Sequence, residues 1–116
     1  MENKLTQWPD DPPTSTRRLR LLAEAASDYW DVPMEELMSK NRTNAVVWPR
    51  SVCMWIARDM GHSYPSIGKW WGKDHGTVIY AERLVNDLKR TKTAYDKQFR
   101  QFVLFYRNRT RNVEKK

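Results

Sequence analysis

Apolar side chains recur at intervals of three and four residues wherever this sequence could form a regular element, and no segment of useful length alternates apolar with polar residues. This spacing is typical of amphipathic helices, whereas alternation would indicate half-buried strands. The clearest examples are Leu19, Leu22, Ala26 and Tyr29; Val78, Ala81, Val85 and Leu88; and Tyr95, Phe99, Phe102 and Tyr106. The sequence therefore predicts an all-α domain of about five to six helices.

Prolines, glycines and helix-capping residues divide the sequence into separate helices. Thr14, Ser15 and Thr16 are suitable N-caps for the first helix, and Pro33 and Pro65 suit the first turn of later ones. We expect the helices to occupy residues 17–30, 34–38, 48–60, 64–71, 75–90 and 93–106.

The charge of the chain is unevenly distributed. The formal net charge is +7 and the isoelectric point is about 9.8, yet residues 1–16 are slightly acidic and rich in proline. We expect these residues to form a flexible leader, residues 17–106 to form the folded domain, and residues 107–116 to form a basic, frayed tail. Such a basic domain predicts a polyanionic partner, either nucleic acid or an acidic membrane surface.

The cysteine content and hydropathy point to a soluble protein of the cytoplasm. Only Cys53 is present, so no intramolecular disulfide can form, and the first residues lack the pattern of a secretory signal. Charged residues interrupt every apolar run before it reaches the roughly 20 residues that cross a bilayer. We therefore expect no membrane association.

Two of the predicted helices have the order of a helix-turn-helix, at about residues 64–90. The short helix 64–71 is followed by Gly72-Lys73, and Asp74 is a good N-cap for the longer helix after it. In this motif the first helix braces the second, whose outer face enters the DNA major groove. The outer face of the second helix carries Gly76, Tyr80, Arg83 and Asp87.

Four segments of the sequence resemble the C-terminal DNA-binding domain of the bacterial replication initiator DnaA. Residues 72–81 read G-K-D-H-G-T-V-I-Y-A and are similar to that family's G-G-R-D-H-T-T-V-[IL]-H-A signature. The other similarities are Leu37-Met38-Ser39-Lys40 to L-L-S-K, Pro49-Arg50 to R-P-R, and Ser63-Tyr64-Pro65-Ser66-Ile67-Gly68 to S-L-P-E-I-G. The resemblance covers about residues 20–90 and implies a Trp-repressor-like helical fold.

The resemblance also implies a role at double-stranded DNA for individual residues. Arg50 matches an arginine that enters the minor groove, while Asp74, His75 and Thr77 match residues that contact bases and phosphates where the recognition helix begins. The positions expected to contact phosphate or approach the duplex are Lys40, Arg42, Tyr64, Pro65 and Lys73. Helix N-terminal amides favour phosphate, and an arginine can enter a narrow minor groove, so the chemistry agrees.

The sequence departs from the family pattern on the face that would meet DNA. Gly76 stands where the family has its first Thr, Tyr80 replaces a His, and one glycine fewer precedes Lys73. These departures leave open which DNA sequence is recognised.

No enzymatic pattern or cofactor site is apparent. Six residues separate Gly61 from Gly68 instead of the four of a phosphate-binding loop, and Trp70 follows Lys69 where Ser or Thr is required. Cys53 and two histidines are too few and too badly spaced for a structural zinc site. We expect no catalysis and no cofactor.

The leading hypothesis is sequence-specific binding, as a monomer, to short duplex sites similar to those of DnaA, in replication origin binding or in regulation of replication initiation. Because the family's ATPase segment is absent from this sequence, we expect the protein to act by occupying DNA in the nucleoid. One alternative is a protein-interaction module that contacts a replication initiator or another replication protein. Others are a transcriptional repressor that uses the same motif, and nucleic-acid coating through charge alone.

Overall fold

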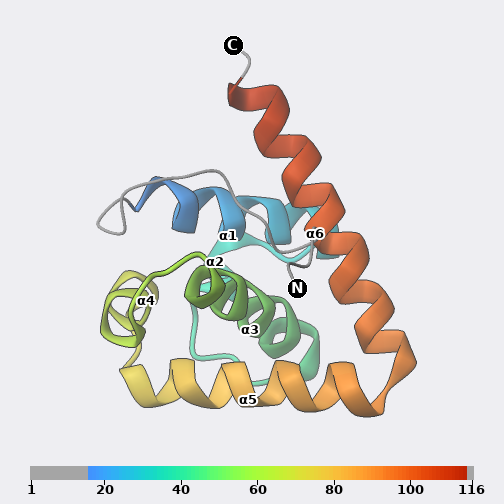
Figure 1. Ribbon diagram of the computed structural model, residues 1–116. Helices are drawn as coiled ribbons and strands as arrows, with labels where there is room; N and C mark the ends of the chain where they lie inside the picture. The colour runs from blue at the N-terminus through green and yellow to red at the C-terminus, as the bar shows by residue number, and fades with distance from the viewer. Residues whose placement is uncertain (1–15, 115–116) are drawn as a thin grey trace.

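The computed structural model describes residues 16–114, which form six α-helices and contain no strand. The helices are α1 (Arg17–Trp30), α2 (Met34–Leu37), α3 (Asn44–Asp59), α4 (Tyr64–Trp71), α5 (His75–Thr91) and α6 (Thr93–Glu114) (Figure 1). The prediction of an all-α chain with about five to six helices is confirmed. Within these residues, no helix is both long and apolar enough to cross a membrane.

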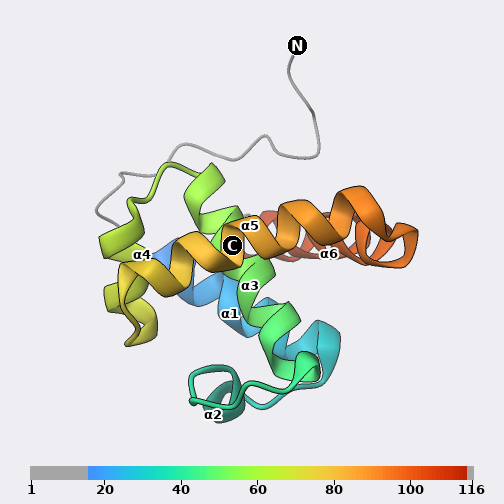
Figure 2. The ribbon, with the colours of Figure 1, turned by 90° about the horizontal axis from the view of Figure 1, so that it is seen from below.

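Helix α3 lies at the centre of the molecule. It packs against α1 on one side and α5 on the other, and α5 crosses it in the view from below (Figures 1 and 2). A helix covered on two sides needs apolar residues around most of its circumference. The buried side chains of α3 accordingly include Val46, Trp48, Val52, Cys53, Met54, Ile56 and Ala57.

Helix α6 is fastened to the domain through a glutamine that bridges two tryptophans. The indole nitrogens of Trp30 in α1 and Trp48 in α3 both donate to Oε1 of Gln98, each at 3.1 Å. Phe102, one turn further along α6, packs against the rings of Tyr29 and Trp30. The predicted aromatic stripe of the last helix is therefore part of the core, and one polar atom joins three helices.

Helix α3 begins at Asn44, not at Trp48 as the sequence predicted. That prediction placed Pro49 in the first turn, where a missing N–H costs nothing. In the structure Pro49 lies inside the helix, and the first turn is instead closed by the amides of Val46 and Val47, which both donate to the carbonyl of Thr43. Because Pro49 has no N–H, one carbonyl group in the preceding turn has no helical donor. That turn lies at the exposed start of the helix, where water can donate instead.

The prediction that the last helix ends near Tyr106 and gives way to a frayed tail is also wrong. Helix α6 continues to Glu114. Arg109 pairs with Asp28 of α1, and Thr110 is buried, with its hydroxyl donating to the carbonyl of Tyr106 at 2.7 Å. Polar contacts extend the helix beyond its apolar stripe. The predicted leader lies outside the described residues except for Thr16, as do Lys115 and Lys116.

We expect Gln98→Leu to lower the free energy of unfolding by about 1–3 kcal/mol, because it leaves two largely buried indole N–H groups without an acceptor. Urea denaturation followed by circular dichroism measures this change. Gln101→Leu is the matched control, since Gln101 is exposed and accepts only a long 3.4 Å bond from Tyr29; its effect should stay below about 0.5 kcal/mol. Equal losses in the two variants would contradict a special role for Gln98.

Candidate nucleic-acid interface

The turn between α4 and α5 is fixed by hydrogen bonds at both of its ends. Gly72 has a φ of 70°, which favours glycine, and the amide of Lys73 donates to the carbonyl of Gly68 at 2.8 Å. This is the Schellman arrangement that ends a helix. Asp74 then caps the start of α5, because its Oδ1 accepts from the amide of Thr77 at 2.9 Å. The prediction that Asp74 is an N-cap is confirmed.

Gly68 allows α4 to lie unusually close to this turn. A Cβ atom at residue 68 would stand 2.6 Å from the carbonyl oxygen of Lys73 and 3.2 Å from that of Asp74. Both neighbours are backbone atoms, which cannot move aside as a flexible side chain would. The glycine therefore sets how closely the start of α5 approaches α4.

A groove of about 1230 Å³ runs between the loop after α2, helix α3 and the first half of α5. We call it the basic groove. It brings together eight of the residues predicted to contact DNA: Lys40, Arg42, Arg50, Lys73, Asp74, Gly76, Thr77 and Tyr80. Segments more than thirty residues apart in the sequence thus form one surface.

Positive charge predominates in the basic groove. Lys40 and Arg42 are exposed, and Asp74 is the one acidic residue among those that line it. Burial is the main cause that lowers the pKa of Lys73, and the positive charges of Arg50, Lys40 and Arg42 lower it further. An anion bound here would relieve this mutual repulsion among four cations.

Arg50 does not project from the surface, contrary to its sequence interpretation as a residue that enters a minor groove. Its side chain is buried, at 6% exposure, and Nε donates to the carbonyl of Leu37 at 2.8 Å. Burial lowers the pKa of its guanidinium group. Arg50 is buried because of a tertiary contact: the loop after α2 folds over its side chain, and the carbonyl groups of that loop face the guanidinium group. The exposed arginine of the groove is Arg42.

Four other predicted residues lie outside the lining of the basic groove. His75 and Arg83 are exposed on α5, and Pro65 is exposed at the start of α4. Tyr64 is partly buried between α4 and α5, where its hydroxyl donates to Glu82 at 2.6 Å. Any contact of these residues with DNA remains a prediction.

Sequence reasoning missed the floor of the groove. Val47, Ser51 and Met54 of α3 line it together with Arg50. They recur with Arg50 at helical spacing, which is the signal that could have identified this face; Ser51 and Met54 lay within the predicted helix, and Val47 lay just before it.

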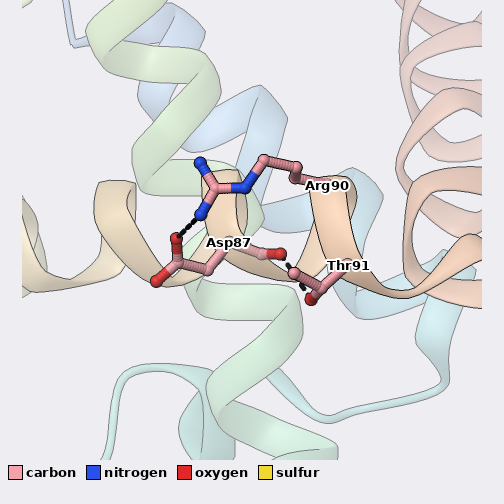
Figure 3. A network of polar contacts seen from close by, with 3 residues as sticks. All are labelled: Asp87, Arg90 and Thr91. Atoms are coloured by element: carbon pink, nitrogen blue, oxygen red, sulfur yellow. Dashed lines mark hydrogen bonds and ion pairs between the residues drawn. The ribbon is translucent and has the colours of Figure 1, made fainter.

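The outer face of α5 changes character beyond Arg83. Asp87 pairs with Arg90 at 2.8 Å, and its backbone carbonyl accepts from the hydroxyl of Thr91 at 2.7 Å (Figure 3). Both charged side chains of the pair are mostly exposed, so the pair adds little to stability. Its effect is to pair the charge of Arg90, on a part of α5 that lies beyond the residues lining the basic groove.

The described residues hold no group of three or more histidine, cysteine, aspartate or glutamate side chains that could bind a metal ion. The thiol of Cys53 is buried and faces the carbonyl of Leu22 at 3.5 Å, and burial raises its pKa far above neutrality. It therefore lacks the thiolate character of a nucleophile.

A short helix, a tight glycine turn and a longer helix beside a basic groove define a helix-turn-helix protein. Residues 20–85 match the family described as the bacterial dnaA protein helix-turn-helix, and the chain belongs to that family. The resemblance seen in its sequence is thereby confirmed.

Several relatives are named chromosomal replication initiator protein DnaA. The protein of Dechloromonas aromatica is 40% identical over 70 residues, which are 59% of this chain and 15% of that protein. That of Caldanaerobacter subterraneus is 35% identical over 77 residues, covering 65% and 17% of the two chains. That of Enterococcus faecalis is 38% identical over 79 residues, covering 66% and 18%. The chain thus matches only a small part of each relative.

We expect Gly68→Ala to destabilise the protein by about 1–3 kcal/mol, because the added methyl group meets backbone atoms in a tightly packed turn. Thermal and urea unfolding measure this change. Gly76→Ala is the matched control in α5: its methyl group would meet only the side-chain Oδ1 of Asp74, at 3.1 Å. Better helix propensity there should offset the contact and leave stability within about 1 kcal/mol. A harmless Gly68→Ala would show that α4 can move away from the turn.

Proposed function

We propose that the basic groove binds double-stranded DNA in a sequence-specific manner. The observation that carries the proposal is the convergence of Lys40, Arg42 and Lys73 on the start of α5. A helix N-terminus presents free amide groups and a positive dipole end, so this surface suits a phosphate backbone. The first half of α5 then enters the major groove, and the loop with Lys40 and Arg42 follows the neighbouring strand or the adjacent minor groove.

Each reading element has a distinct role in this proposal. His75 and Thr77 meet base edges and phosphates at the start of α5, and Arg83 extends the contact one turn beyond Tyr80. Gly76 lets the helix backbone approach the duplex closely. Arg42 takes the minor-groove role that the sequence suggested for Arg50, because Arg42 is exposed and Arg50 is not.

The biological role that follows is occupancy of short sites in the context of replication initiation. Membership of the DnaA helix-turn-helix family and relatives named replication initiators support this role. The protein would bind as a monomer in the nucleoid, at an origin or at a site that regulates initiation, without catalysis or cofactor. A replication initiator is then a competitor or a partner at the same DNA.

Selection of duplexes from a random pool at physiological salt tests the proposal. We expect a short enriched motif whose affinity falls by about tenfold in Arg42→Ala and in His75→Ala. Arg42→Ala should also make the slope of log affinity against log salt shallower by about one, if a phosphate contact is lost.

Arg100→Ala is the matched control for Arg42→Ala, because it removes the same charge from an exposed position on α6, away from the basic groove. It should leave the affinity for the selected duplex within about twofold. A pool without enrichment, together with equal losses in Arg42→Ala and Arg100→Ala, would show that the protein merely coats nucleic acid through charge. No measurable binding at low salt would instead favour a protein-interaction module.

A further inference from the structure

The guanidinium group of Arg50 holds the loop after α2 from the inside. Besides the bond to Leu37, its Nη2 donates to the carbonyls of Ser39 and Asn41, both at 3.1 Å. A longer contact, at 3.4 Å, reaches the carbonyl of Glu36. One buried side chain thus serves four carbonyl groups of the segment 36–41.

Lys73 holds the same loop from the other side. Its Nζ donates to the carbonyl of Ser39 at 2.9 Å, so that this oxygen accepts from Arg50 and Lys73 together. Because Lys73 belongs to the turn between α4 and α5, the bond joins the loop directly to the start of α5. The two elements proposed to read DNA are therefore connected through a single carbonyl group.

The internal bonds of the loop shape its turns without fixing its place. The amide of Asn41 donates to the hydroxyl of Ser39 at 3.0 Å, and that of Thr43 donates to Oδ1 of Asn41 at 2.8 Å. Both bonds span only two residues, so they fix the turns only as long as the loop itself is held in place. The side chain of Asn41 also ties the loop to Glu36 of α2, at 3.1 Å, and the hydrogen bonds from Arg50 and Lys73 attach it to α3 and to the start of α5.

An arginine suits this task better than a lysine. Its planar guanidinium group carries five donors in a rigid fork and can meet several carbonyls in fixed directions, whereas an ammonium group is a point charge on a flexible stem.

We propose that Arg50 is a positioning residue: it holds loop 39–42 at a set distance from the start of α5, so that Arg42 faces DNA before any DNA is bound. The inference rests on the proposed function of the basic groove. Its benefit is preorganisation, because a loop that is already ordered loses less entropy when it binds.

Hydrogen exchange of the DNA-free protein tests the first part of this proposal. In Arg50→Gln we expect the amides of Asn41 and Thr43 to exchange about tenfold faster, because the loop opens more often. The amide of Val85 in the core of α5 should keep its protection if the domain stays folded. Arg50→Lys should behave like Arg50→Gln if the fork geometry matters, and like the wild type if charge alone matters. Unchanged loop exchange in Arg50→Gln would overturn the proposal.

A double-mutant cycle on affinity for the selected duplex tests the second part. If Arg50 acts through Arg42, Arg50→Gln should weaken binding about tenfold in the wild-type background and less than about threefold in the Arg42→Ala background. Equal losses in both backgrounds would show that Arg50 contacts DNA by itself and would overturn the positioning role.

Lys73→Met keeps the inference testable if the Arg50 variants do not fold. It removes one bond to the carbonyl of Ser39 from a partly buried position and should also speed exchange at Asn41, whereas unchanged exchange would contradict the shared anchor at Ser39. If the wild-type protein binds no duplex, the proposed function fails, while the exchange measurements still decide whether Arg50 holds the loop.

Discussion

The burial of α3 between α1 and α5 is the constraint on which the rest of the structure depends. These two neighbours make its most extensive contacts, and the face with Val47, Ser51 and Met54 lines the groove. Arg50 lies on that same face, and the segment that covers it supplies its polar partners. The central helix thus determines both the floor of the groove and the place of the loop that forms its wall.

The electrostatics of the groove follow from this packing. Arg50 directs its hydrogen bonds at carbonyl groups, yet its charge remains and lowers the pKa of Lys73 together with Lys40 and Arg42. Carbonyl groups accept the hydrogen bonds of a guanidinium group but leave its positive charge in place. A carboxylate would neutralise that charge. The buried arginine therefore orders the loop and still contributes to the potential that attracts an anion.

Local sequence patterns predicted the helices, their caps and the turn between α4 and α5. Contacts between residues far apart in the chain determined the burial of Arg50 and the length of α6. Asp74 and Gly72 act through neighbours in the chain, so their cap and turn could be predicted from residue type and spacing. The partners of Arg50 lie on a loop at least nine residues away, and nothing in the local sequence distinguishes a buried arginine from an exposed one. The ion pair of Arg109 with Asp28, which spans 81 residues, likewise extends α6 beyond the point where its apolar stripe ends.

Two of the departures from the family signature alter the same wall of the groove in opposite ways. Gly76 and Tyr80 are four residues apart and therefore lie on one face of α5. Gly76 removes a side chain beside the capping carboxylate of Asp74, while Tyr80 adds an aromatic ring that is 64% exposed. A duplex bound here would approach the helix backbone more closely at its start and meet a bulky ring one turn later. The proposed DNA reader thus keeps its anchoring cations and presents a different surface to the bases.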